Sequence, residues 1–159
     1  MARTGVFRER RAHRVAWVRY RAAHLEFLHA LFYDLGGAQM ARVLVIDDEV
    51  TARAMVRQAL ESAGHEVVEA DDGASGLELL RSGRFQLAVV DVMMPVKGGI
   101  ETLIDIHRDY KDLKVIVISG KIDVDSDAFR SLAEHFGASC ILRKPFSVRE
   151  FLEAVRELL

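Results

Sequence analysis

From Ala41 to the end of the chain, short runs rich in Val, Ile and Leu alternate with amphipathic segments. The runs are Val43–Ile46, Glu66–Glu69, Leu87–Val90, Val115–Ile118 and Cys140–Leu142. A run that is apolar throughout indicates a strand covered by helices on both faces, which is typical of parallel sheets. Only the second run alternates with polar residues, so we expect it at an edge of the sheet.

The segments between and after these runs have the period of amphipathic helices. Apolar residues recur at three- and four-residue steps within residues 52–63, 74–80, 100–107, 129–136 and 148–155. Gly64 and Gly137 are expected to close the first and fourth of these helices, and Ser147 with Glu150 has the spacing of a capping box for the last. Five strand–helix units joined by right-handed crossovers predict an α/β fold with an open, doubly wound parallel sheet.

The first 40 residues differ from the remainder in composition. They hold seven arginines, no lysine and three acidic residues, whereas residues 41–159 carry a net charge of −6. Apolar residues between Val15 and Phe32 recur at helical steps, which is compatible with an amphipathic helix that carries arginines on its other face. The alternative is a translated leader upstream of a true start at Met40. Both interpretations of residues 1–40 as a basic N-terminal extension stay open, and we assign residues 41–159 to one domain.

Composition also excludes several classes of protein. The formal net charge of the 159 residues is −2, so we expect no nucleic-acid binding through the acidic domain. Cys140 is the single cysteine, which excludes an internal disulfide and gives no indication of a zinc cluster. No apolar run reaches the roughly 18 residues of a membrane span, and no signal-peptide pattern follows the early arginines. We therefore expect a cytoplasmic protein without a membrane span.

Polar side chains directly follow four of the five runs. They are Asp47 and Asp48 after the first run, Asp91 after the third, Ser119 after the fourth and Lys144 near the end of the fifth. In a doubly wound sheet, ligands bind at the carboxyl ends of the strands. Clustered carboxylates repel one another and need a cation, and hard oxygen ligands suit Mg²⁺. With a lysine and a serine hydroxyl facing the acids, the pattern predicts metal-assisted phosphoryl transfer to a carboxylate.

These residues stand in four motifs that resemble the receiver domains of two-component response regulators. The motifs are Val45-Ile46-Asp47-Asp48-Glu49, Asp91-Val92-Met93-Met94-Pro95 with Gly98-Gly99, Ile118-Ser119-Gly120, and Lys144-Pro145-Phe146. Each motif is weak alone, but all four occur in order and at the family's spacing across residues 42–159. The resemblance implies a (βα)5, flavodoxin-like fold with strand order 2-1-3-4-5.

The resemblance also implies a role for each residue. It implies that Asp91 is the phosphoacceptor and receives its phosphoryl group from a histidine kinase or a phosphotransfer protein. Ser119 and Lys144 are implied to contact that phosphoryl group. The implied Mg²⁺ ligands are Asp47, Asp48, Asp91 and the main-chain carbonyl of Met93. A protein of this kind is a phosphoacceptor that assists its own phosphotransfer, and not an enzyme in the ordinary sense.

Ile141 departs from the family pattern. Many receivers carry Tyr or Phe three residues before the site lysine, where the ring turns inward after phosphorylation, and Ile141 stands at that switch position. We therefore expect no aromatic gating of the surface formed by the fourth and fifth strands. A phosphorylation-independent adaptor on the same fold stays open as an alternative function.

The chain ends with the fifth predicted helix, so we expect a stand-alone receiver. It would signal through protein contact or pass its phosphoryl group along a relay. Phosphorylation adds about −1.5 to −2 charge at one carboxylate, and this change is expected to reshape the surface of the fourth helix, fifth strand and fifth helix. A downstream partner, which the sequence does not identify, is expected at this surface, and a homodimer through the same surface stays open.

Overall fold

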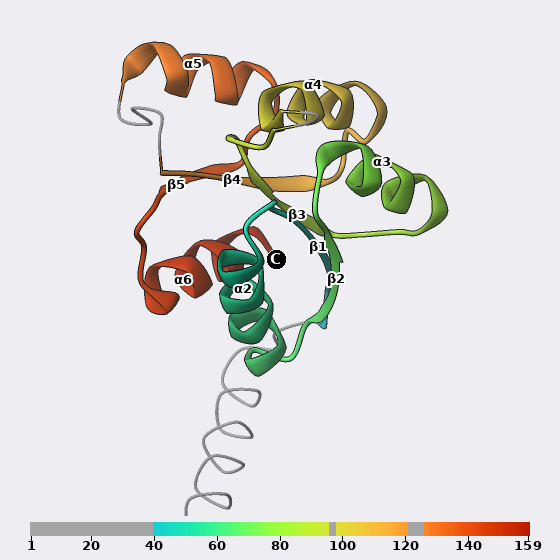
Figure 1. Ribbon diagram of the computed structural model, residues 1–159, viewed down its shortest axis with the longest axis vertical. Helices are drawn as coiled ribbons and strands as arrows, with labels where there is room; N and C mark the ends of the chain where they lie inside the picture. Colours follow the sequence, from blue (N-terminus) through green and yellow to red (C-terminus); the bar gives the residue numbers. More distant parts are fainter. Residues whose placement is uncertain (1–39, 96–97, 121–125) are drawn as a thin grey trace, which may run out of the picture. The chain divides into compact units, whose positions relative to one another are not determined.

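The computed structural model describes residues 40–95, 98–120 and 126–159. Apart from Met40, the basic extension of residues 1–40 lies outside the described residues. Both interpretations of this extension therefore stay predictions. The labels of helices and strands follow Figure 1, in which the first described helix is α2.

The described residues form a five-stranded parallel sheet (Figure 1). Its strands are β1 (Arg42–Ile46), β2 (Glu66–Ala70), β3 (Leu87–Asp91), β4 (Lys114–Ser119) and β5 (Cys140–Arg143). Their order across the sheet is β2-β1-β3-β4-β5, which confirms the predicted strand order. β1 and β3 are neighbours where the strand order reverses, and this switch point is where doubly wound sheets bind ligands.

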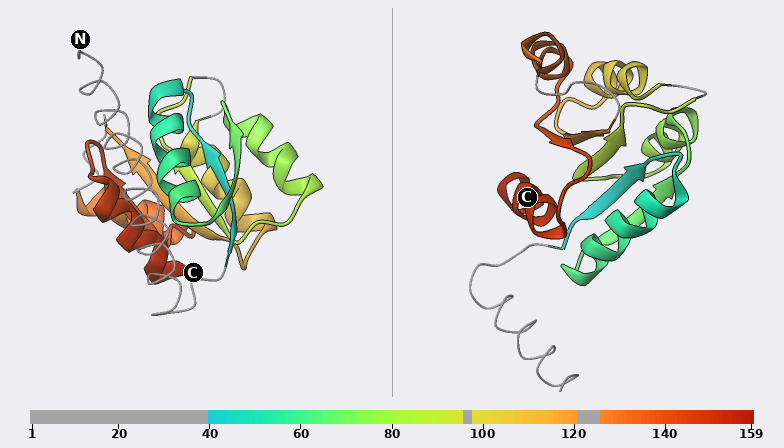
Figure 2. Two further views of the ribbon diagram at one scale, coloured as in Figure 1. Left: turned by 90° about the horizontal axis from the view of Figure 1, so that it is seen from below. Right: turned by 60° about the vertical axis from the view of Figure 1, so that its left-hand side comes forward.

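Helices cover both faces of the sheet. They are α2 (Val50–Ser62), α3 (Gly73–Ser82), α4 (Gly99–Asp109), α5 (Asp127–His135) and α6 (Val148–Leu158). Figures 1 and 2 show α3, α4 and α5 on one face and α2 with α6 on the other. The arrangement confirms the predicted doubly wound α/β fold.

Each face of the sheet has its own hydrophobic core. Alternate residues of β1 and β3 point to opposite faces, so Leu44 and Val90 pack with α3, α4 and α5, while Val45 and Val89 pack with α2 and α6. Both strands are buried from end to end apart from the first residue of β1. This double burial explains why their sequences are continuously apolar.

The two edge strands differ in how well the sequence predicts their burial. β2 is partly exposed, as its alternating pattern predicts. β5 has an apolar sequence that predicts full burial, yet Cys140, Ile141 and Leu142 are only half-buried. Within the described residues β5 pairs with β4 alone, so one of its sides lacks a neighbouring strand.

Four apolar residues that the helical periods assign to the core are exposed, and one of them is Ala74 in the first turn of α3. Met55 of α2, Leu132 of α5 and Val148 of α6 are 38%, 42% and 45% exposed. Each lies at the margin of its apolar stripe, whereas the central residues of the same helices are buried. These residues are exposed because each apolar stripe is wider than the part of the helix that faces the sheet.

The predicted helix ends are confirmed. Gly64 and Gly137 follow α2 and α5 with φ of 86° and 85°, a left-handed conformation that residues with a Cβ adopt at a cost. Ser147 and Glu150 form the capping box of α6, with each side chain bonded to the other residue's main chain. The two glycines end α2 and α5, and the capping box begins α6.

Gly99 holds the start of α4 against the end of β3. Its N–H donates to the Val92 carbonyl at 3.1 Å, and a Cβ built on Gly99 would come within 2.0 Å of the Asp91 carbonyl oxygen. By contrast, a Cβ on Gly98 would meet no atom within 4 Å in the described part of the chain. The close approach at position 99 therefore leaves no room for a side chain.

We expect Gly99→Ala to destabilise the domain by about 1–3 kcal/mol, the usual cost of overpacking. The added methyl group would press on the main chain of β3, which cannot rotate away as a flexible side chain could. Gly98→Ala is the control, and because Gly98 is the N-cap of α4, this variant should show only the smaller loss of a less favourable cap, below about 1 kcal/mol. Urea unfolding of the two variants checks this, and equal stabilities would contradict it.

His65 gives stability a pH dependence. Its Nδ1 accepts a hydrogen bond from the Ala41 N–H at 3.3 Å, and burial lowers its pKa below the ordinary value of 6.5. The neutral ring is therefore the stabilising form, so its contribution is complete above pH 6.5 and is lost as the pH falls through the lowered pKa.

We expect the parent protein to lose up to about 1 kcal/mol relative to His65→Gln as the pH falls below this range, the typical net contribution of one hydrogen bond. His135→Gln removes an exposed histidine and is the control. Urea unfolding at several pH values measures the difference. A parent and His65→Gln variant with parallel pH profiles would exclude this role.

Candidate functional site

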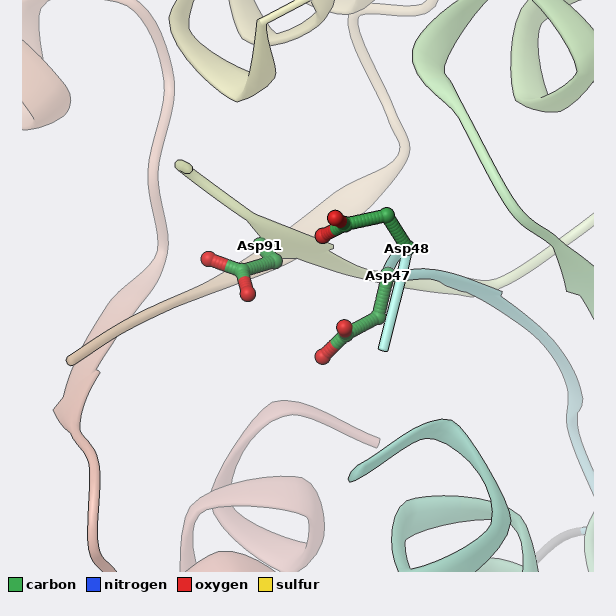
Figure 3. Close-up of side chains that lie close together, drawn as sticks. All are labelled: Asp47, Asp48 and Asp91. Carbon is green, nitrogen blue, oxygen red and sulfur yellow. The ribbon is translucent and has the colours of Figure 1, made fainter. Parts of the chain in front are cut away.

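The carboxyl ends of β1 and β3 bring three acidic side chains together. Ile46 of β1 pairs with Val90 of β3, so the next residues, Asp47 and Asp91, lie side by side, and Asp48 follows. One carboxylate oxygen of each lies within 4.8 Å of one from each of the others. Figure 3 shows the three carboxyl groups turned to the same side of the strand ends. The predicted convergence of these acids is present in the structure.

Asp47 is fully buried and held at several atoms. Its N–H donates to the Ala70 carbonyl of β2 at 3.2 Å. Its Oδ1 accepts from the Glu49 N–H at 2.8 Å, and its main-chain oxygen accepts from Arg53 Nη1 at 2.6 Å. The N-cap of α2 is Glu49, so Asp47 is not placed there as a helix cap.

Asp91 is also buried, whereas Asp48 is exposed. The Oδ1 atom of Asp91 accepts from the Met93 N–H at 3.0 Å, which places Met93 beside the acid. The N-cap of α4 is Gly98, seven residues further on, so Asp91 is not a helix cap either. Its position at the end of a central strand leaves the carboxylate directed into the cluster.

Lys144 joins the two buried acids from the other half of the sheet. Its Nζ donates to Asp47 Oδ2 at 2.8 Å and to Asp91 Oδ2 at 2.7 Å. Its N–H donates to the Ser119 carbonyl at 2.8 Å, and the Lys144–Pro145 peptide is cis. A Cβ on Gly120 would lie 3.2 Å from Lys144 Cβ, so glycine leaves room for the lysine stem.

Burial and charge act against each other in this cluster. Burial raises the pKa of Asp47, and its hydrogen bonds from Lys144 and Glu49 offset only part of that effect. Burial alone would lower the pKa of Lys144, but its hydrogen bonds and charge interactions with Asp47 and Asp91 together raise it. Ionised carboxylates 4.8 Å apart repel by about 3–4 kcal/mol at an effective dielectric of about 20. One ammonium therefore compensates the cluster only in part.

The other predicted site residues lie nearby. Ser119 is fully buried at the end of β4 and is paired with Arg143 of β5 in the sheet register. Ile141, at the switch position, is half-buried and packs against the core on the side of α3, α4 and α5. A surface groove of about 480 Å³ is lined by residues 141–146, among them Lys144, and by Glu150.

Arg53 is absent from the residues that the sequence alone singles out. Its guanidinium binds the Asp47 carbonyl and also Glu69 Oε1 of β2 at 3.2 Å. The five-residue separation of Asp48 and Arg53 could have indicated this role. A helix that begins just after Asp48 places Arg53 about one turn along, where its long side chain can reach back to the end of β1.

Comparison with known proteins identifies the family. The sequence model of the response regulator receiver domain matches residues 43–156. The chain belongs to the response regulator receiver family. This membership agrees with the resemblance of the four motifs and with the observed strand order.

Relatives of this receiver domain are response regulators. The response regulator MprA of Mycolicibacterium vanbaalenii is 36% identical over 118 residues, which are 74% of this chain and 50% of the relative. The chemotaxis protein CheY4 of Vibrio cholerae has a solved structure that matches with a TM-score of 0.70 and 31% identity, covering 76% of this chain and all of CheY4. The response regulator TrrA of Thermotoga maritima, solved in complex with Mg²⁺-BeF, matches with a TM-score of 0.66 and 31% identity, with the same coverage.

This receiver domain spans about half the length of the curated relatives that it matches. Receiver domains are phosphoacceptors and generally not enzymes in the ordinary sense, and they bind Mg²⁺ at an acidic pocket. Asp47, Asp48 and Asp91 form such a pocket here. None of the described helices is both long enough and apolar enough to cross a membrane.

We expect Lys144→Met to destabilise the metal-free receiver domain by about 2 kcal/mol. Removing one partner of a fully buried ion pair costs about 3–5 kcal/mol, and the cost is smaller here because the Lys144 side chain is 20% exposed. Lys114→Met removes an exposed lysine outside the site and should leave stability nearly unchanged. Urea unfolding in the presence of a chelator measures both, and a Lys144→Met variant as stable as the parent would refute the expectation.

Proposed function

We propose that this receiver domain accepts a phosphoryl group on Asp91, supplied by a histidine kinase or a phosphotransfer protein, with Mg²⁺ bound beside it. The observation that carries the proposal is the cluster of Asp47, Asp48 and Asp91 with Lys144 bonded to two of them. A purely structural ion pair would need one carboxylate for one ammonium. Three acids against one lysine leave negative charge for a divalent cation.

The residues present fit Mg²⁺. The cluster offers hard carboxylate oxygens from two adjacent strand ends, and Asp48 is exposed, so water can complete the coordination. We assign the protein ligands to Asp47, Asp48, Asp91 and the main-chain carbonyl of Met93. Bound there, Mg²⁺ would neutralise the acids and the oxygens of an incoming phosphoryl group.

Asp91 is the proposed nucleophile because its motif resembles the phosphoacceptor motif of the family, and the Met93 N–H and Lys144 hold its carboxylate. A carboxylate oxygen attacks the phosphorus of a phosphohistidine, so a new O–P bond forms as the P–N bond breaks. The imidazole keeps the electron pair and takes a proton from solvent. Lys144 stays between Asp47 and the phosphorylated Asp91, where its ammonium offsets charge on the phosphoryl oxygens.

Ser119 is the proposed hydroxyl contact of the phosphoryl group. It ends β4, next to β3 in the sheet, and its carbonyl already holds the Lys144 N–H. Phosphorylation would draw Ser119 and Lys144 toward one new anion, and both belong to the β4 and β5 strand ends. We therefore place the output surface on α5, β5 and α6, where a downstream protein or a second copy of the chain would bind.

The stand-alone type stays a prediction, because the chain spans about half the length of its curated relatives. The complex of TrrA with Mg²⁺-BeF supports a metal and phosphoryl site in a protein of this fold. MprA is named a response regulator and CheY4 a chemotaxis protein, and both names support a signalling role for this chain.

One observation favours the phosphorylation-independent adaptor. Ile141 is half-buried against the core on the side of α3, α4 and α5, and an aliphatic side chain at this position offers no ring to move after phosphorylation. The adaptor would use the same output surface, but its state would not depend on Asp91. Chemistry at Asp91 separates the two functions.

We expect the parent protein, given acetyl phosphate and Mg²⁺, to gain about 80 Da as one phosphoryl group. A chelator should abolish the gain, and Asp91→Asn should show none. Asp112→Asn changes an exposed acid outside the cluster and should react like the parent. Intact-protein mass spectrometry reads the result. A parent that stays unmodified, indistinguishable from Asp91→Asn, would favour the adaptor.

A further inference from the structure

Arg53 connects two elements at the border of the metal site. It lies on the first turn of α2, where its N–H bonds to the Glu49 carbonyl at 2.9 Å. Its Nη1 donates to the Asp47 carbonyl at 2.6 Å, and its Nε donates to Glu69 Oε1 at 3.2 Å. The side chain is only 16% exposed. A planar guanidinium presents donors in several fixed directions, so one group binds a carbonyl and a carboxylate together.

Glu69 holds the guanidinium from β2. Its register partner in β1 is Val45, two residues before Asp47. The second Glu69 oxygen forms an ion pair with Arg57, whose Nε lies 3.4 Å away, and the Arg57 side chain is 46% exposed. Both arginines therefore share one carboxylate, but within the described residues the bond to the Asp47 carbonyl comes from Arg53.

The Asp47 carbonyl belongs to the peptide unit that precedes Asp48. Because that unit is planar, holding its oxygen sets the plane from which the Asp48 main chain and side chain continue. The Asp47 N–H is held by Ala70 and its carboxylate by the Glu49 N–H. Asp48 itself is exposed, so packing contributes little to its orientation and the main chain must supply it.

We propose that Arg53 is a positioning residue for the metal site, which holds the Asp47–Asp48 peptide so that both carboxylates face the cation, and that Glu69 orients Arg53. The inference rests on the proposed function, since it concerns Mg²⁺ at the acidic cluster. The positive charge of Arg53 acts in the opposite direction, because a cation near the cluster repels Mg²⁺. Removing Arg53 therefore weakens Mg²⁺ binding if positioning dominates and strengthens it if charge dominates.

The test compares Arg53→Met with Arg57→Met, since both remove one positive charge and one ion pair with Glu69. We expect Arg53→Met to weaken Mg²⁺ binding about tenfold, the scale seen for residues that orient metal ligands. Arg57→Met should bind Mg²⁺ as the parent does or slightly more tightly. Calorimetric titration with MgCl₂ measures the affinities. Arg53→Met binding as tightly as Arg57→Met, or more tightly, would overturn the proposal.

Hydrogen exchange in the metal-free protein gives a second readout. The Asp47 amide, bonded to the Ala70 carbonyl of β2, and the Glu49 amide, bonded to the Asp47 carboxylate, should exchange faster in Arg53→Met than in Arg57→Met, while amides of the central strand β3 keep the same rates in both. Equal exchange at Asp47 and Glu49 would overturn the proposal. If Arg53→Met does not fold, Glu69→Gln replaces it. That variant should weaken Mg²⁺ binding by less than tenfold, and unchanged affinity and exchange would overturn the proposal.

These outcomes also separate this proposal from the function on which it rests. A parent protein that binds no Mg²⁺ would refute the proposed metal site, and the exchange rates in the metal-free turn would still decide the role of Arg53. A parent that binds Mg²⁺, with an Arg53→Met variant that binds it equally well, would refute the role of Arg53 alone.

Discussion

The repulsion among three carboxylates is the constraint on which the site depends. Asp47 and Asp91 are buried, and Asp48 lies beside them with oxygens no more than 4.8 Å apart. Lys144 donates to the two buried acids and reduces the repulsion, but one positive charge does not balance three negative ones. The remaining negative charge favours a small, hard cation and suits the phosphoryl transfer that we propose. A neutral pocket of the same shape would have neither property.

Main-chain contacts, more than side-chain packing, hold the acids in place. Gly99 packs directly on the Asp91 carbonyl, so the start of α4 lies close against the strand end. At β1, Arg53 and Ala70 bond to the Asp47 carbonyl and N–H. Backbone bonds can orient an exposed side chain such as Asp48, which has few packing partners of its own. The receiver domain therefore combines a hydrogen-bonded frame with a pocket in which Asp48 is exposed to solvent.

β5 connects the acidic site with the proposed output surface. Lys144 directly follows this strand, Ile141 lies within it, and the groove of residues 141–146 runs along it. As an edge strand it is only half-buried, so it has fewer contacts to break when its position changes than the central strands have. A change of charge at Asp91 reaches Lys144 through one hydrogen bond. An edge strand attached to that lysine is well placed to transmit the change to a partner.

Local sequence determined much of this protein. Apolar runs and helical periods predict five strands and five helices, because burial on both faces of a sheet requires continuous apolar residues. The glycine and capping-box positions predict the helix ends, and the four motifs predict the family, the strand order and the acidic cluster. Tertiary structure alone decided what depends on partners distant in the chain. It places Lys144 on acids 97 and 53 residues away, leaves β5 half-buried through its edge position, and directs Arg53 to the Asp47 carbonyl. The hydrophobic periodicity of a sequence indicates which residues are buried. The contacts of Lys144 and Arg53 depend instead on which strands are neighbours in the sheet.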